Sequence, residues 1–400
     1  MARNPPLRLL YLTNSRLPGE KAHAIQIMHT CAALAALVQV RLVHARRVNR
    51  AWLRGITDLR THYALPRDVA RHALPSLDLM PMVNWLPVGQ AGGYALAFAV
   101  QNATYHIALL LWLLFASADV YYTRDSLSAA VCLVLRRRRV YFEAHTFPTS
   151  AAGLRLQRWL SKRLDGLAVL TPALRQRYIA LGCAPQNVHV IPDAVDLQLF
   201  APRAQAAARA RTALPAAEFI ALYAGQMYAW KGVETLVAAA QLLPAGCCVV
   251  LVGGTPEDLP RLQALAHSAD PQRLRFVGHV APTEVPHYLA AADVLVLPNS
   301  GHAEISRNHT SPLKMFEYMA AQRAIVASDL PALRTVLVPE ENALLVPPDD
   351  APALAAAILR LQADAPLRQR LSAAAAIAVT RHTWDNRARS ILKLVAGDAA

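Results

Sequence analysis

The amino-acid sequence predicts an α/β fold made of two Rossmann-like domains, each a doubly wound parallel sheet. Short apolar segments alternate with helical segments along the chain, which is the pattern of parallel sheets covered by helices. The chain has 400 residues, more than a single compact core usually organises. A polar, proline-containing segment at residues 192–202 interrupts the alternation, which then restarts. We therefore predict an N-terminal domain over residues 1–195 and a C-terminal domain over residues 203–380.

The predicted strands are the apolar segments, and a charged, alanine-rich helix over residues 204–212 separates two sets of them. The first set comprises residues 7–12, 38–43, 120–123, 140–143, 167–170 and 188–191, and the second comprises residues 219–224, 247–252, 274–277, 294–297, 324–327 and 343–346. Ligands of doubly wound sheets bind beyond the carboxyl ends of the strands. We therefore expect the active site to lie between the two domains.

Positive charge is concentrated in the N-terminal half of the chain. Residues 1–200 carry 23 Lys and Arg against 10 Asp and Glu, whereas residues 201–400 carry 18 against 17. A one-sided basic surface favours anionic partners such as acidic lipid headgroups, a phosphorylated acceptor or nucleic acid, and a solvated arginine-rich face is the alternative. Nucleic acid is disfavoured, because no aromatic residues are interleaved with the basic ones and no recognition motif is present.

The cysteines and one apolar segment bear on the cellular compartment. The five cysteines form no CxxC pair and no disulfide-like spacing, and no signal peptide is evident, so we expect a cytoplasmic protein. Residues 95–118 are strongly apolar, but polar residues leave only about eleven uninterrupted positions, where a membrane span needs about twenty. This segment predicts a buried helix or one in the membrane interface, which leaves peripheral attachment to the inner face of the cytoplasmic membrane open.

The first strand of the second set is followed by a phosphate-binding pattern. Gly225 and Gln226 come directly after the strand, and Lys231 and Gly232 precede a helical segment. A glycine at a strand end lets the backbone approach a ligand, and a lysine before a helix start adds charge to the positive end of the helix dipole. The pattern predicts a phosphate site, and an ordinary strand–turn–helix with a solvated lysine is the alternative.

A second pattern lies further along the chain. Ser311 and Pro312 have the character of an N-cap and a first helical residue, which would leave the amides of Leu313 and Lys314 free for a diphosphate. Glu317 follows one turn later, where its carboxylate could accept hydrogen bonds from ribose hydroxyls. Stabilisation of the helix start by this acidic residue is the alternative.

Together the two patterns resemble the donor-binding motifs of the family 4 glycosyltransferases, which have the GT-B fold of two Rossmann-like domains. The resemblance covers essentially the whole chain. Gly278 and Val280 stand in a segment similar to the turn that holds the nucleotide base through backbone contacts. Residues 381–397 resemble the final helix, which packs back on the N-terminal domain. Other segments resemble the family's interdomain segment, a glycine turn and the strand leading to the sugar site, at residues 187–200, 251–254 and 291–298.

Carried over to this sequence, the resemblance implies that Lys231 binds the donor diphosphate and Glu317 the ribose. The sequence departs from the family pattern at two positions. Gln226 stands where an arginine is common, and it carries no charge. The family's paired glutamates have seven residues between them, but eight positions before Glu317 stands His309. His309 is the first candidate to bind the donor sugar's hydroxyls, and Glu304 is the second.

Three further candidates lie in the N-terminal half. His145 follows a strand end and resembles the family's active-site histidine, which contacts the donor sugar near the anomeric centre; a structural histidine is the alternative. We expect Glu143 to point to the opposite face by strand alternation. In the first loop, Gly19 supplies turn flexibility, and Lys21 either meets a donor or acceptor phosphate or faces solvent.

The resemblance implies transfer of a sugar from a nucleoside diphosphate sugar to a glycan or lipid-linked acceptor, with retention and without a cofactor. His145, Lys231 and Glu317 would be the catalytic residues, and cell-envelope or exopolysaccharide synthesis the process. The sequence contains no HExxH, no Asp-x-Asp and no clustered Cys and His, so no metal site is expected. A sugar-nucleotide epimerase of the same fold and a non-catalytic relative that binds nucleotide sugar are the alternatives.

Overall fold

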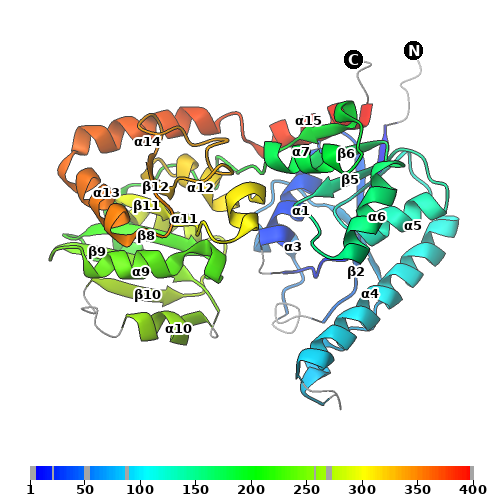
Figure 1. Ribbon diagram of the computed structural model, residues 1–400, viewed down its shortest axis with the longest axis horizontal. Coiled ribbons are helices and arrows are strands. Elements are labelled where there is room, and N and C mark those ends of the chain that lie inside the picture. The colour runs from blue at the N-terminus through cyan, green and yellow to red at the C-terminus, as the bar shows by residue number, and fades with distance from the viewer. Residues whose placement is uncertain are drawn as a thin grey trace. The chain divides into compact units, whose positions relative to one another are not determined.

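Two units, each built around one parallel sheet, make up the computed structural model (Figure 1). The structure describes residues 6–19, 22–48, 55–85, 90–255, 258–266 and 273–396. Unit 1 contains the described residues up to Ile191 and those from Trp384 onward, and unit 2 is Pro192–Thr383. The division therefore falls at the start of the proline-containing segment, and the C-terminal helix α15 (Trp384–Ala396) belongs to the first unit.

The sheet of unit 1 has seven parallel strands in the order β3-β2-β1-β4-β5-β6-β7. The order reverses between β1 and β4, which is the switch point of a doubly wound sheet. The strands are β1 (Arg8–Thr13), β2 (Gln39–Ala45), β3 (Ala70–Leu74), β4 (Val120–Thr123), β5 (Val140–Ala144), β6 (Gly166–Val169) and β7 (Val188–Val190).

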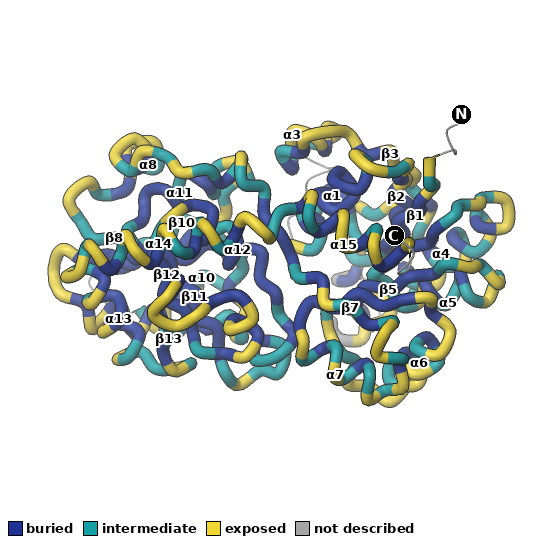
Figure 2. The backbone as a smooth tube through the Cα atoms, turned by 90° about the horizontal axis from the view of Figure 1, so that it is seen from above, coloured by how far each residue is buried: buried dark blue, intermediate teal, exposed yellow. Residues whose placement is uncertain are grey.

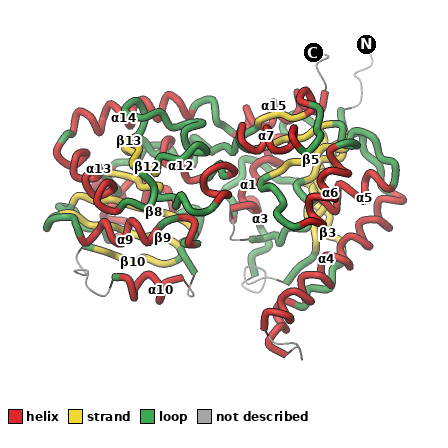
Figure 3. The backbone as a smooth tube through the Cα atoms, in the orientation of Figure 1, coloured by secondary structure: helices red, strands yellow, loops and turns green. Residues whose placement is uncertain are grey.

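Helices cover both faces of this sheet (Figure 3). On one face Phe142 of β5 packs in a cluster with residues of α4, α5, α6 and α7, and on the other face Glu143 meets α1 and α15. Successive strand residues point to opposite faces, so these two neighbours define the two layers. The helices are α1 (Ala22–Leu34), α3 (Leu59–His62), α4 (Gln90–Phe115), α5 (Ser126–Val134), α6 (Ala151–Ser161) and α7 (Pro172–Ala180), with short 3₁₀ turns at Met80–Trp85 and Pro185–Asn187.

The sheet of unit 2 has six parallel strands in the order β10-β9-β8-β11-β12-β13, again with the reversal next to the first strand. One face packs on α8, α11, α12 and α14, and the other on α9, α10 and α13. The strands are β8 (Phe219–Gly225), β9 (Cys247–Gly253), β10 (Leu274–Gly278), β11 (Val294–Leu297), β12 (Ala324–Ser328) and β13 (Leu344–Val346). The helices are α8 (Gln205–Thr212), α9 (Val233–Gln241), α10 (Asp258–Leu265), α11 (Val285–Ala291), α12 (Leu313–Ala320), α13 (Ala351–Ala363) and α14 (Ala365–Val379).

Every strand expected from the sequence occurs in the structure, with bounds that differ by at most two residues. Both sheets have buried inner strands (Figure 2), and burial on both faces is what makes such strands read as continuous apolar runs. The sequence missed only β3 among the strands described. This edge strand reads ARHAL and is mostly exposed, so it lacks the apolar run that marks the others.

The apolar segment at residues 95–118 is helical, as the sequence predicted. It forms the larger part of α4, a continuous helix of 26 residues, because its polar side chains face unit 1 and do not interrupt the helix. Gln101, for example, is fully buried and donates a hydrogen bond to Asn14 at 2.6 Å. By length and composition alone, Gly92–Phe115 could cross a membrane. Only 22% of its most apolar stretch is buried in the protein.

Candidate functional site

Two glycines stand at the ends of the turn that connects β8 to α9. Gly225 has φ +134°, and a Cβ at this position would lie 2.7 Å from Nζ of Lys314. Gly232 begins α9 with φ +64°, where a Cβ would lie only 1.9 Å from the carbonyl oxygen of Pro298. Both positions require glycine for conformation and for space. The turn between them delivers Lys231 to the carboxyl end of the sheet.

The start of α12 differs slightly from the predicted one. The helix begins at Leu313 with Pro312 in the capping position, and no side chain caps it. The predicted N-cap, Ser311, instead accepts a hydrogen bond from the backbone N–H of Asp193 at 3.1 Å. The first amides of a helix have no partner within the helix, so the start of α12 presents unused donors and the positive end of a dipole.

The sequence analysis predicted a role for the backbone amide of Lys314 but none for its side chain, which is the least expected feature of this site. Its Nζ lies 3.6 Å from the ring centroid of Tyr223 and has no hydrogen-bond partner among the described residues. Burial, and secondarily the charge of Lys231, hold the pKa of Lys314 well below its usual range, against the opposing effect of Glu317. The sequence did contain a signal for this side chain, because a lysine three residues before a glutamate lies next to it on the same face of a helix.

Lys231 ends a 3₁₀ turn at Ala229–Lys231, and its Nζ lies 3.8 Å from the ring centroid of Trp230. Burial lowers the pKa of this lysine to about 7. Neither Lys231 nor Lys314 forms an ion pair within the part of the chain that the structure describes. Burying a cation without a counter-ion is unfavourable, which is why the pKa values of both lysines are lowered.

Glu317 lies on the same face of α12 as Lys314. Burial raises the pKa of its carboxyl group to about 7, although the nearby Lys314 acts in the opposite direction. The three ionisable groups therefore all shift toward their neutral forms. An anion with hydroxyl groups beside it would reverse this, because the ammonium groups would meet negative charge and the carboxylate would accept hydrogen bonds.

The two positions that depart from the family pattern also lie in unit 2. Oε1 of Gln226 is buried without a hydrogen-bond partner in the structure as described. His309 ends a π-helical turn at Ile305–His309 and is 4% exposed, and its Nε2 lies 3.7 Å from Oε1 of Glu304. The structure thus brings together the two candidates for the missing first glutamate, and it does not choose between them.

The base-binding candidates take different forms in the structure. Gly278 ends β10 with φ +79° and open space where a Cβ would stand. The side chain of Val280 packs partly buried against the core of unit 2, so only its backbone is offered to a ligand. Sequence reasoning missed Asn299, which follows β11 and is fully buried with neither amide atom hydrogen-bonded to described residues. Its signal was a polar residue directly after the apolar strand and Pro298.

In unit 1, His145 and Glu143 are partners, which corrects the expectation that Glu143 points away. Nε2 of His145 lies 2.5 Å from Oε1 of Glu143. The two residues are two positions apart at the end of β5, so alternation puts them on the same face. Burial, together with the nearby charge of Arg124, lowers the pKa of His145 to about 4, although Glu143 opposes this shift. His145 is therefore neutral at pH 7.

Glu143 is the centre of a buried network that joins four elements. Gln26 of α1 and Arg387 of α15 donate to its Oε1 at 2.8 and 2.7 Å, and Tyr122 of β4 donates to Oε2 at 2.5 Å. Burial alone would raise the pKa of Glu143, but the charge of Arg387 and the His145 hydrogen bond hold it well below its usual range. The network presents a neutral imidazole in a fixed orientation at the strand end.

The first loop contributes less. The N–H of Gly19 donates to the hydroxyl of Tyr63 at 2.6 Å, which fixes the loop before α1. Lys21 lies outside the described residues. Among those that are described, no group of three or more His, Cys, Asp or Glu is arranged to hold a metal ion.

Comparison with known proteins finds similarity over the C-terminal unit and in the overall fold. A family model described as glycosyl transferases group 1 matches residues 218–364, a stretch that begins at β8 and includes both lysines and Glu317. The match covers less than half of the chain, and it shows what this stretch is similar to. The fold class of the chain is GT-B, with the two parallel-sheet units described above.

Sequence relatives of the chain include proteins whose names refer to inositol compounds. A D-inositol 3-phosphate glycosyltransferase of Xylanimonas cellulosilytica is 34% identical over 226 residues, which are 54% of this chain and 52% of the relative. A phosphatidyl-myo-inositol mannosyltransferase of Mycolicibacterium smegmatis is 34% identical over 167 residues, 41% of each chain. The chain thus spans about half the length of the curated relatives it matches.

Solved structures resemble the chain over nearly its whole length. Anabaena Alr3699/HepE, in complex with UDP-glucose, has a TM-score of 0.75 and 16% identity, and the match covers 98% of this chain and 99% of the other. A sucrose-phosphate synthase from Thermosynechococcus elongatus has a TM-score of 0.71 and 24% identity, covering 97% and 98%. At these identities the likeness shows the fold alone.

Proposed function

We propose that the protein transfers a sugar from a nucleoside diphosphate sugar to an anionic or lipid-linked glycan acceptor, with retention of the anomeric configuration. The observation that carries the proposal is the pair of lysines near helix starts, half-buried Lys231 before α9 and buried Lys314 in α12, neither of which has an ion-pair partner among the described residues. A diphosphate supplies the charge that this pocket lacks. Anabaena Alr3699/HepE, which shares the fold, was solved with UDP-glucose, and this supports the choice of donor.

In this proposal the two lysines act on the leaving group. Negative charge grows on the diphosphate as its bond to the sugar breaks, and cations already in place stabilise it without reorganisation. Lys231 and Lys314 would bind the diphosphate with the first amides of α12, and Gln226 would add a neutral hydrogen bond where an arginine is common. Glu317 would accept hydrogen bonds from the ribose. No metal is needed for the leaving group, because the two ammonium groups take that role.

The donor sugar and the transfer step are assigned to the remaining candidates. His309, with Glu304 as the alternative, would bind the sugar hydroxyls, and the backbone around Gly278 and Val280 the base. His145 would act as a neutral imidazole that donates Nε2–H to Glu143 and accepts a hydrogen bond from a sugar hydroxyl at Nδ1. The names of the inositol-phosphate relatives and the basic N-terminal half favour an anionic acceptor, and we place the reaction in cytoplasmic synthesis of cell-envelope or exopolysaccharide glycans.

Thermal-shift and calorimetric titrations with UDP-, GDP- and ADP-sugars test the donor site. We expect one nucleotide class to raise the melting temperature, and we expect Lys231→Ala to abolish that shift while Lys162→Ala, an exposed lysine of α6, leaves it intact. Transfer to phosphorylated and lipid-linked acceptors is then measured with the bound sugar nucleotide. Binding of no sugar nucleotide, or nucleotide release without a glycosylated product, would contradict the proposal.

A further inference from the structure

The outer side of α4 is apolar and uncovered. The helix contains no Asp, Glu, Lys or Arg over its 26 residues. Its inner side supplies Tyr105, Leu109 and Leu113 to the core of unit 1, all fully buried. The outer side carries large apolar side chains that are more than half exposed: Ile107 at 58%, Leu111 at 53%, Leu114 at 54% and Phe115 at 92%. A helix that is apolar on every side is usually covered on every side.

An apolar groove runs between α4 and α5, beside this surface. It has a volume of about 410 Å³ and is lined chiefly by aliphatic side chains, including Ala103 and Leu110 of α4 and Leu127, Val131 and Val134 of α5. Leu127 and Val134 are themselves largely exposed. The volume is within the range of cavities that hold small ligands, and the lining suits a hydrocarbon chain.

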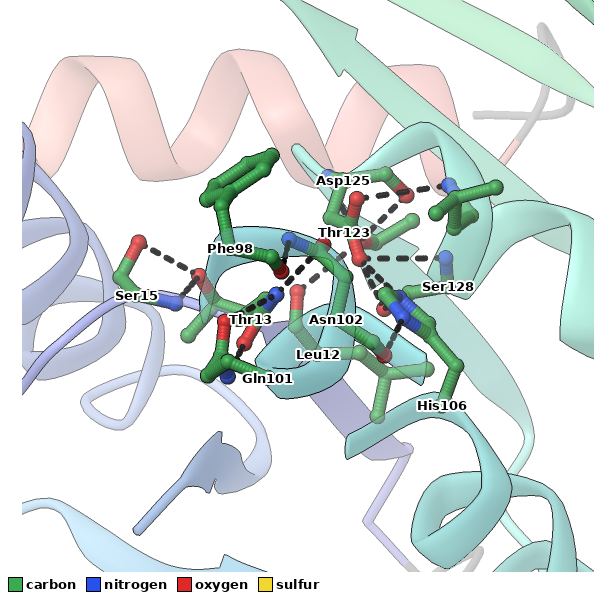
Figure 4. Close-up of polar contacts among 12 residues, drawn as sticks. Leu12, Thr13, Ser15, Phe98, Gln101, Asn102, His106, Thr123, Asp125 and Ser128 are labelled. Atoms are coloured by element: carbon green, nitrogen blue, oxygen red, sulfur yellow. Dashed lines mark hydrogen bonds and ion pairs between the residues drawn. The ribbon is translucent and has the colours of Figure 1, made fainter. Parts of the chain in front are cut away.

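A polar cluster at the edge of the groove fixes α4 against α5 (Figure 4). Nε2 of His106 lies 2.6 Å from Oδ2 of Asp125, and Nδ1 of the same ring lies 2.7 Å from the carbonyl oxygen of Asn102. Ser128 donates to Oδ2 of Asp125 at 2.6 Å, and this carboxylate also caps α5. The two helices are therefore tied together where the groove begins, so the groove is part of the folded unit.

Basic side chains border the same surface at the C-terminal end of α4. Arg137 donates hydrogen bonds to the carbonyl oxygens of Leu113 and Ala116, which brings its segment to the helix end. Its neighbours Arg136 and Arg138 are exposed. Arg137 therefore places positive charge at the C-terminal end of α4, a helix that contains no acidic residue.

We propose that the outer side of α4, the α4–α5 groove and Arg136 with Arg138 dock the protein on an anionic lipid bilayer. The helix lies along the interface, a lipid chain enters the groove, and the arginines meet the headgroups. This docking surface belongs to unit 1 alone, so the inference stands whether or not the proposed transfer reaction is correct.

Two other occupants fit less well. A second copy of the chain, paired through α4 about a twofold axis, would bring the arginines of two basic surfaces together, and like charges oppose such a contact. A membrane-spanning α4 would have to withdraw Tyr105, Leu109 and Leu113 from the sheet, which would remove part of the core. Lying in the interface leaves these residues where they are.

Co-sedimentation of the full chain with vesicles tests the proposal. We expect binding to equimolar phosphatidylglycerol and phosphatidylcholine, weaker binding to pure phosphatidylcholine, and weakening by salt. The variant Ile107→Glu/Leu111→Glu/Leu114→Glu should bind at least about tenfold more weakly, whereas Ile377→Glu, at an exposed apolar position of α14, should not change binding. Loss of Arg136 and Arg138 by substitution with Gln should weaken binding about 25-fold, since each basic residue contributes roughly fivefold.

Filling the groove separates its role from that of the surface. Ala103→Phe places a ring in the groove at an exposed position, and we expect several-fold weaker vesicle binding with an unchanged melting temperature. Equal binding of this variant and the wild type would overturn the chain-binding role of the groove. Vesicle binding unaffected by the triple glutamate variant, a dimer that this variant dissociates, or resistance of the bound protein to carbonate extraction would overturn the docking proposal. The thermal shift with sugar nucleotides, measured on every variant, reports separately on the donor site.

Discussion

Replacement of Lys314 by methionine should separate a ligand-binding role of this residue from a structural one. In the ligand-free protein its ammonium group is buried, has no hydrogen-bond partner in the described structure and lies over the ring of Tyr223. Methionine has a similar length and makes favourable contacts between sulfur and an aromatic ring, so it can occupy the same space. The substitution removes a buried charge without leaving a cavity.

The two expected effects have opposite signs. Replacing a buried, unpaired cation by an apolar side chain of similar shape should stabilise unit 2 by about 1 kcal/mol, which raises its melting temperature by roughly 2–4 °C. Binding of the nucleoside diphosphate should weaken, because a hydrogen bond to a charged group contributes about 1.5–3 kcal/mol, or roughly 10- to 150-fold in Kd.

Differential scanning calorimetry and isothermal titration with the nucleoside diphosphate measure both effects on the same samples. Lys162→Met, at an exposed position of unit 1, is the matched control and should change neither quantity. A melting temperature several degrees lower, with an unchanged Kd, would refute the reasoning, because it would show that the ammonium group stabilises the fold and takes no part in binding.

Three further predictions follow from the same contacts. Nucleotide affinity should be highest near pH 7, because Lys231, whose pKa is lowered to about 7, loses its proton above this pH, and Glu317, whose pKa is raised to about 7, gains one below it. Titrations from pH 6 to 9 check this, and Glu317→Gln should remove only the fall in affinity below pH 7. Gly225→Ala should weaken nucleotide binding at least about tenfold, because its Cβ would occupy the place of a lysine ammonium group, and titration measures this. Glu143→Gln should lower the stability of unit 1 by about 3–5 kcal/mol in denaturant unfolding, since buried Arg387 loses its carboxylate partner, and adding Arg387→Met should recover part of the loss.

Local pattern was sufficient for most of the fold. A strand covered by helices on both faces must be apolar along its whole length, so the apolar runs located every described strand except β3. That strand lies at the sheet edge, where its residues are mostly exposed and need not be apolar, so it has no apolar run. Hydropathy also does not show that Gln101 and Asn102 of α4 bond to Asn14, because this partner is far away in the sequence.

The candidate site divides in the same way. Motif spacing located Lys231, Glu317 and the start of α12, since turn glycines and helix starts are local properties of the chain. Only the tertiary structure placed the Lys314 ammonium group against Gly225 and joined Glu143 to Gln26 and Arg387. Burial and the distance between groups far apart in sequence determine these contacts and their shifted pKa values, and neither quantity is encoded in any short segment.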